Sequence, residues 1–76
     1  MVKPSDLKVG QVVEALWVEP PTIHIRVKKL YHGPHGAIEG PRLNKKTGAR
    51  IFRSYTYYAR VVDLVRIIKQ PEEVKP

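Results

Sequence analysis

In the segment TIHIRVKK, residues 22–29, apolar and polar side chains alternate strictly from Thr22 to Lys28, and this alternation constrains the fold more than any other feature of the sequence. Ile23, Ile25 and Val27 fall on one side, and the polar residues between them fall on the other. Successive side chains of a strand point to opposite faces, so a period of two predicts a strand with one buried face. The β-branched residues on the inner side favour the same interpretation.

Glycine and proline divide much of the remaining chain into short segments. Residues 12–18 are rich in apolar side chains and predict a strand, which a Pro-Pro pair ends. Residues 31–36, YHGPHG, predict a loop, and residues 44–48, NKKTG, predict a turn in which Asn44 and Gly48 suit positive φ. Residues 37–43, AIEGPRL, predict a short strand that its proline restricts to a sheet edge or a bulge.

Residues 49–69 run for 21 positions without glycine or proline. Aromatic and β-branched residues dominate, so we expect strand structure, with alternating faces from Arg50 to Val62. The second half also fits helical spacing, and a strand through the whole segment would exceed the usual length. We therefore expect a break or bulge near Asp63, followed by a short strand or a single helical turn.

The predicted fold class is all-β, because about five short strands with turns between them suit a small antiparallel barrel. We favour an SH3-like barrel, with an OB-like barrel as the alternative, and allow one short helical turn near the C-terminus. Residues 5–69 should form the single domain, with residues 1–4 and 70–76 as flexible termini. The chain has no cysteine to form disulfides, so its core must stabilise it, and Trp17 is interpreted as the anchor of that core.

The chain is strongly basic, with 14 Lys and Arg against 7 Asp and Glu, a formal charge of +7 and a pI near 10. Such an excess attracts polyanions, although a surface that serves solubility is the alternative. No apolar run is long enough to cross a membrane, and the N-terminus lacks the apolar core of a signal peptide. We therefore expect no membrane association and a cytoplasmic protein, whose scarcity of Cys, Asn and Gln resembles that of thermophile proteins.

Residues 40–62 carry the most specific functional signal: six basic residues, four aromatic residues and no acid. Alternation along a strand would place Arg50, Phe52, Tyr58 and Arg60 on one face, where bases can stack on rings while arginines hold phosphates. The competing interpretation is that the two rings cover a second small core, with the arginines extending past them.

Further basic residues lie near that face. The predicted turn carries two lysines at an exposed tip, and the outer side of the strand at residues 22–29 adds three basic side chains, His24 among them. The candidate nucleic-acid-binding residues are Arg26, Lys28, Arg42, Lys45, Lys46, Arg50, Phe52, Tyr58 and Arg60.

Metal binding and catalysis have little support. His32 and His35 are spaced H-x-x-H and His24 would be a third ligand, but no cysteine or carboxylate stands close to them in sequence. No phosphate-binding glycine motif and no nucleophile beside a base are present, so we expect no catalytic residue, no metal site and no cofactor.

The sequence thus predicts a non-enzymatic protein that binds nucleic acid mainly through backbone contacts, since no recognition helix is visible. DNA and RNA, and single and double strands, stay open. The alternative is a protein-interaction module, regulatory or viral, that docks on a larger protein or nucleoprotein machine.

Overall fold

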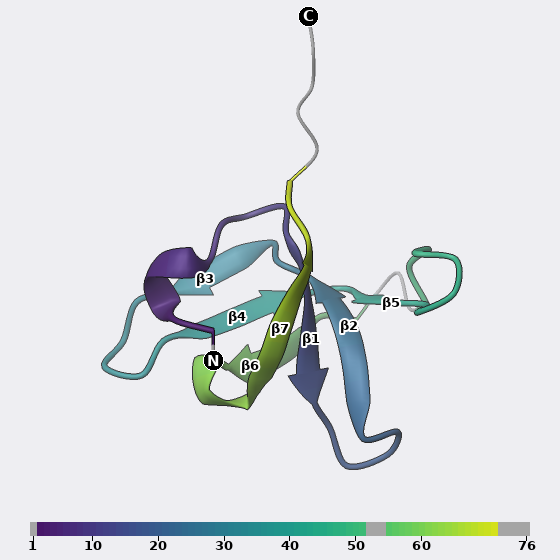
Figure 1. The fold of residues 1–76 in the computed structure, drawn as a ribbon, viewed down its shortest axis with the longest axis horizontal. Coiled ribbons are helices and arrows are strands. Elements are labelled where there is room, and N and C mark those ends of the chain that lie inside the picture. The colour runs from purple at the N-terminus through teal and green to yellow at the C-terminus, as the bar shows by residue number, and fades with distance from the viewer. Residues whose placement is uncertain (1, 52–54, 72–76) are drawn as a thin grey trace, which may run out of the picture.

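The computed structural model describes residues 2–51 and 55–71, and this part of the chain is almost entirely β (Figure 1). It holds seven strands and two short 3₁₀ turns, and it contains no longer helix. In chain order these are η1 (Pro4–Asp6), β1 (Val12–Leu16), β2 (Thr22–Arg26), β3 (Lys29–Tyr31), β4 (Ala37–Gly40), β5 (Arg42–Leu43), β6 (Tyr57–Arg60), η2 (Val61–Asp63) and β7 (Leu64–Lys69). The predicted all-β class is confirmed. Among the described residues, no helix is long and apolar enough to cross a membrane.

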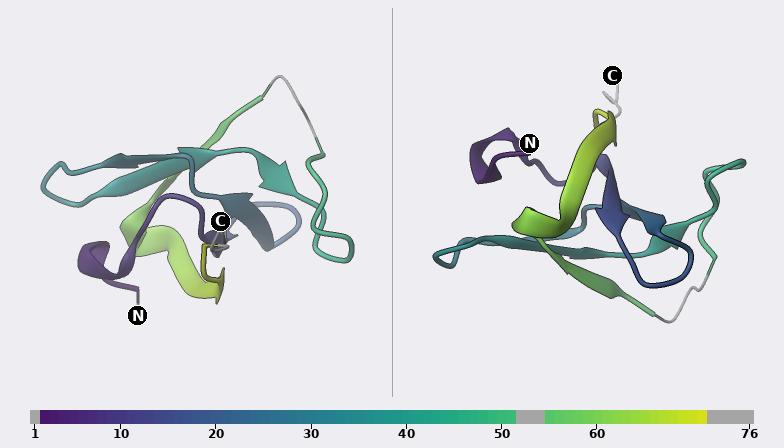
Figure 2. Two further views of the ribbon diagram at one scale, coloured as in Figure 1. Left: turned by 90° about the horizontal axis from the view of Figure 1, so that it is seen from above. Right: turned by 60° about the horizontal axis from the view of Figure 1, so that its bottom comes forward.

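The strands form two antiparallel sheets, of which one has four strands in the order β5-β2-β1-β7 and the other has three in the order β3-β4-β6. The hairpin of β3 and β4 lies on one side of the molecule, with β7 and the N-terminal segment on the other (Figure 2, left). Seven strands replace the predicted five because two of the expected strands bend and divide between the sheets.

The bend lies where β2 passes into β3 and β4 passes into β5. The pairing continues through it, because the amide of Arg26 donates to the Pro41 carbonyl at 3.1 Å and the amide of Lys28 donates to the Glu39 carbonyl at 2.9 Å. Lys29 also pairs with Glu39, so two residues stand opposite one, which is the geometry of a β-bulge. Pro41 interrupts its strand, as its missing N–H predicts.

Gly40 makes this bend possible. A Cβ atom at residue 40 would overlap the backbone carbonyl oxygen of Arg26, so only glycine lets the two chain segments approach so closely. The bend therefore depends on Gly40, whereas the prediction from sequence attributed the irregularity of residues 37–43 to Pro41 alone.

The predicted alternation from Thr22 to Lys28 is confirmed. Ile23, Ile25 and Val27 are essentially inaccessible to solvent, while Arg26 and Lys28 are exposed. Pairing places Val13 and Ala15 of β1 opposite Ile25 and Ile23. The hydrophobic core cluster consists of Leu7, Val13, Ala15, Ile23, Ile25, Val27, Ile38, Ala59, Val61 and Leu64.

The expected break near Asp63 is also confirmed. The 3₁₀ turn η2 covers Val61–Asp63, and β7 follows directly and pairs with β1. Two register shifts occur along this pairing, so the side chains of β7 do not keep one uninterrupted alternation.

The interpretation of Trp17 as a core anchor was wrong. Trp17 lies beyond the end of β1, is 38% exposed, and packs edge-on against Tyr57 with ring centroids 5.4 Å apart. Its neighbours Leu16 and Val18 are more exposed still. The core is instead filled by aliphatic side chains, which pack between two closely spaced small sheets.

The single strand face predicted from Arg50 to Val62 was also wrong. Arg50 forms an isolated bridge with Leu43 beside the four-stranded sheet, whereas β6 begins at Tyr57 in the three-stranded sheet. Tyr55 and Thr56 belong to no strand. Arg50 and residues 57–60 therefore pair with different sheets and do not share one strand face.

The predicted turn at residues 44–48 is confirmed and projects from the end of β5 (Figures 1 and 2). Gly48 has a φ of 76°, but Asn44 does not have positive φ. Asn44 acts instead through its side chain, whose Oδ1 accepts hydrogen bonds from the amides of Lys46 and Thr47 at 2.8 and 3.2 Å. At the chain ends, Val2 packs against the core and Pro71 lies beside Gly10, while the predicted flexibility of both termini stays a prediction.

Candidate functional site

Four basic side chains from three segments of the chain line two adjoining hollows at one end of the four-stranded sheet. One hollow, of about 300 Å³, is lined by Arg26, Lys28 and Arg50 together with Gly10 and apolar groups. The other, of about 220 Å³, is lined by Arg26 and Lys69, again with Gly10. Because Arg26 and Gly10 belong to both, we treat the two hollows as one surface, the basic groove, defined by Arg26, Lys28, Arg50 and Lys69.

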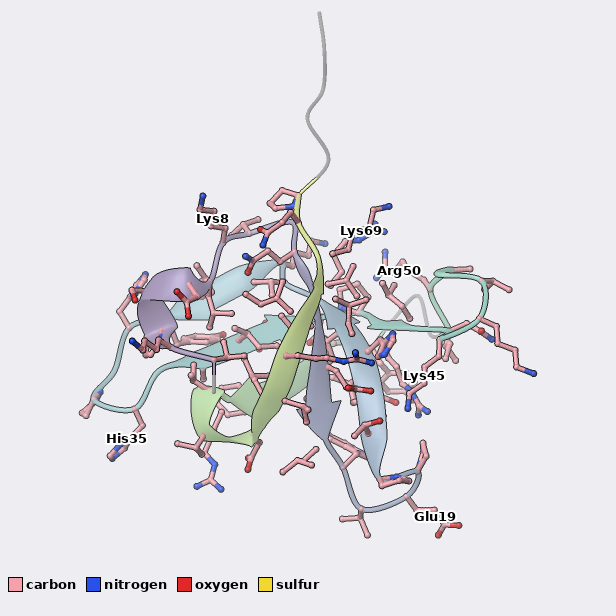
Figure 3. The ribbon with its side chains drawn as sticks, viewed as in Figure 1. Lys8, Glu19, His35, Lys45, Arg50 and Lys69 are labelled. Atoms are coloured by element: carbon pink, nitrogen blue, oxygen red, sulfur yellow. The ribbon has the colours of Figure 1, made fainter. Side chains whose placement is uncertain are left out.

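The folding of the sheet explains this convergence. Val12 of β1 pairs with Arg26 on one side and with Lys69 on the other, so these two residues flank it across three strands. Strands lie about 4.8 Å apart, which puts the two backbones about 10 Å from each other. Figure 3 shows Lys69 and Arg50 at the same end of the molecule, with Glu19 at the opposite end.

The basic groove concentrates positive charge, because no acidic residue stands among the described residues that line either hollow. Several like charges held close together raise the local potential and attract an anion with several charges more strongly than a single one. The arrangement therefore suits a polyanion.

The middle of the same sheet carries a carboxylate. The side chain of Glu14 is 13% exposed, and its Oε1 accepts a hydrogen bond from Nε of Arg66 at 3.0 Å. Its Oε2 accepts from the Thr22 hydroxyl at 3.1 Å and lies 3.6 Å from Nε2 of His24. Burial acts to raise the pKa of Glu14, but the hydrogen bonds from Arg66 and Thr22 and the nearby positive charge outweigh it, so the pKa lies below its usual value.

The turn at residues 44–48 bends back toward this carboxylate. Nζ of Lys45 donates to the Thr22 hydroxyl at 2.6 Å, which in turn donates to Glu14. Lys46, in contrast, is exposed at the tip. The predicted cations of the turn thus differ, because one is tied to the sheet and the other extends into solvent.

A second group of side chains lies on the outer face of the three-stranded sheet. Pairing sets Lys29, Glu39 and Tyr58 in one row, and Tyr31, Ala37 and Arg60 in the next. We name this surface the tyrosine platform and define it by its five larger side chains: Lys29, Tyr31, Glu39, Tyr58 and Arg60. Of the predicted aromatic face, Tyr58 and Arg60 lie here, while Phe52 lies outside the described residues.

The other predicted residues divide among these surfaces. Arg26, Lys28 and Arg50 line the basic groove, and Lys45 and Lys46 belong to the turn. Arg42 lies on β5 and is half-buried, with an Nε atom that is buried and makes no hydrogen bond to any described residue. The candidates therefore do not form one continuous strand face.

Sequence reasoning missed Lys69, Lys29 and Tyr31. The register shifts of β7 hid the position of Lys69, and Tyr31 was assigned to the loop that follows β3. The doublet Lys28-Lys29 was a usable signal, because it breaks the alternation at the point where the strand bulges.

The three histidines do not form a cluster. His32 and His35 are exposed in the loop between β3 and β4, whereas His24 lies on β2 beside Glu14. Within residues 2–51 and 55–71, no group of three or more His, Cys, Asp or Glu side chains is placed to hold a metal ion.

Comparison with known proteins gives no match: no family model, no curated protein and no solved structure is similar to this chain.

Proposed function

We propose that the protein is a non-enzymatic nucleic-acid-binding domain that holds the phosphate backbone in its basic groove. The observation that carries this proposal is the convergence of Arg26, Lys28, Arg50 and Lys69 on two adjoining hollows lined by no acidic residue in the described chain. Phosphate contacts dominate nucleic-acid affinity, and they need no particular base sequence.

The groove continues toward further cations, which favours a long anion over a single phosphate. Arg50 bridges to Leu43 at the base of the turn that carries Lys45 and Lys46. The extended phosphate backbone of a nucleic acid contacts the basic groove and the turn together, whereas a small anion reaches only one of them. The formal charge of +7 acts in the same direction by attracting polyanions from a distance.

The proposed architecture is an SH3-like barrel with two bent strands. Joining β2 to β3 and β4 to β5 leaves five runs of strand, with η2 before the last run. The last strand returns beside the first, since β7 pairs with β1. An OB-like barrel is the less favoured alternative.

A titration of the protein against single- and double-stranded DNA and RNA tests the proposal. We expect binding to at least one of these at about 50 mM salt, and a large loss of affinity at about 200 mM. A sulfated polysaccharide of similar charge density serves as the control polyanion, because it lacks bases. Absence of binding to all four nucleic acids at low salt would refute the proposal.

The second candidate function, docking on a larger protein, is favoured by a different surface. Leu16, Trp17 and Val18 are exposed and, together with Asp63, line a hollow of about 270 Å³. Exposed apolar side chains that gather in this way are typical of protein interaction sites. A partner bound there would leave the basic groove accessible, so the two candidates predict different footprints.

A further inference from the structure

The tyrosine platform is built by three strands whose outward side chains touch one another. The rings of Tyr31 and Tyr58 have their centroids 5.8 Å apart at an interplanar angle of 55°. Nζ of Lys29 stands 5.1 Å from the centroid of the Tyr31 ring, in a cation–π contact. The Tyr31 hydroxyl donates to Oε1 of Glu39 at 3.2 Å, which fixes the orientation of that ring.

The side chains of the tyrosine platform are not part of the hydrophobic core. Ile38 and Ala59, the inward-facing neighbours on β4 and β6, are buried, whereas Tyr58 is 55% exposed. More than half of this large aromatic residue thus faces solvent, and Arg60, two residues later on the same strand, forms an ion pair with Asp63 at 3.4 Å. An aromatic ring held in this way by a sheet is a surface on which a flat ligand can stack.

We propose, resting on the proposed function, that the tyrosine platform stacks unpaired bases, and hence that the preferred ligand is single-stranded nucleic acid. Every base has a π-face, so stacking on tyrosine tolerates any sequence. In a duplex the faces of the internal bases are already covered by their neighbours. A duplex therefore gains the phosphate contacts of the groove but not those of the rings.

The bulge links the two surfaces. Lys28 lines the basic groove, while the next residue, Lys29, stands over Tyr31 on the platform. The bulge interrupts the alternation, so both lysines are exposed, and the chain passes from the four-stranded to the three-stranded sheet at this point. A single strand that leaves the groove at Lys28 meets the platform at once.

The distribution of charge favours phosphates in the basic groove and bases on the tyrosine platform. The groove has no acidic lining residue, but the platform holds the Glu39 carboxylate between Lys29 and Tyr58. A carboxylate repels a phosphate and tolerates an uncharged base. The phosphates consequently belong in the groove, and the bases belong on the rings.

The test is Tyr58→Leu, titrated by fluorescence anisotropy with an oligothymidylate of about 12 nucleotides and with a duplex of the same length. We expect the wild-type chain to prefer the single strand. The variant should lose about tenfold more affinity for the single strand than for the duplex, with an unchanged salt dependence, since a lost ring removes no charge.

Two matched variants make the result specific. Tyr58→Phe keeps the ring and should keep the preference for the single strand. Tyr55→Leu removes another exposed tyrosine, which lies outside the platform and is 63% exposed, and should leave both affinities as they are. Circular dichroism melting of each variant verifies the fold before the titration.

The results distinguish a failure of base stacking on the tyrosine platform from a failure of nucleic-acid binding in the basic groove. If Tyr58→Leu stays folded and lowers neither affinity, or lowers both equally, base stacking on the platform is wrong, while binding through the basic groove stands. If the wild-type chain binds neither the single strand nor the duplex, the proposed function is wrong, and this inference falls with it.

Discussion

Glu14 and Arg66 stand 52 positions apart in sequence, yet the Nε atom of the arginine lies 3.0 Å from the carboxylate across the pair of β1 and β7. The contact joins the first and last strands of the described chain, which are neighbours in the four-stranded sheet. It also places a negative charge at the centre of a face that otherwise carries His24, Arg66 and Lys45.

The first prediction concerns the pH dependence of stability. The pKa of Glu14 is lowered in the folded state, so the ionised carboxylate stabilises the fold above the unfolded pKa of about 4.3. That stabilisation is lost as the pH falls through the lower, folded pKa. Glu14→Gln should therefore cost about 1 kcal/mol of unfolding free energy at pH 7 and less at pH ~3, below the unfolded pKa.

Urea denaturation of the wild-type chain and of Glu14→Gln at both pH values measures this difference. Glu19→Gln is the matched control, because Glu19 is exposed in the loop between β1 and β2. A destabilisation that is equal at both pH values would contradict the role given to the Glu14 charge.

The sequence predicted the inner face of β2, the turn at residues 44–48 and the break near Asp63, because each depends on local periodicity or turn chemistry. It did not predict that Arg50 and β6 pair with different sheets, since that depends on the bend at Gly40, where a Cβ atom would overlap the Arg26 carbonyl oxygen. Three of the four groove cations come from predicted residues. Their convergence with Lys69 follows from pairing across Val12, which is a long-range contact.

The second prediction concerns Gly40. Gly40→Ala should destabilise the protein by about 3 kcal/mol or more, because the added Cβ overlaps the Arg26 carbonyl oxygen and the backbone must move. Gly33→Ala, whose Cβ meets no atom within 4 Å, should stay within about 0.5 kcal/mol of the wild type. Thermal melting of both variants measures the contrast, and comparable losses would show that the bend does not need glycine.

The third prediction ranks two apolar residues. Ile25 is fully buried, so Ile25→Ala should cost about 2–5 kcal/mol. Trp17→Ala should cost less than this, since the residue is 38% exposed and lies outside the hydrophobic core cluster. Equilibrium denaturation gives both values. A larger loss for Trp17 would restore it as the core anchor.

The fourth prediction concerns the charges of the groove. Lys28→Gln should reduce the slope of log affinity against log salt by ~0.7–0.9, the share of one phosphate contact, and Arg26→Gln should do the same. Lys3→Gln also removes one exposed cation but lies outside the groove, so its slope should match the wild type. Equal slope changes in all three variants would mean that only net charge matters.

The location of the bound strand is tested most directly by backbone amide chemical shifts recorded during titration with a single-stranded oligonucleotide. We expect the largest shifts at Gly10, Arg26, Lys28, Lys29 and Lys69, with further shifts at Tyr31 and Tyr58. Shifts confined to Leu16, Trp17 and Val18, with the groove amides unchanged, would contradict the account and favour the loop after β1 as the binding surface.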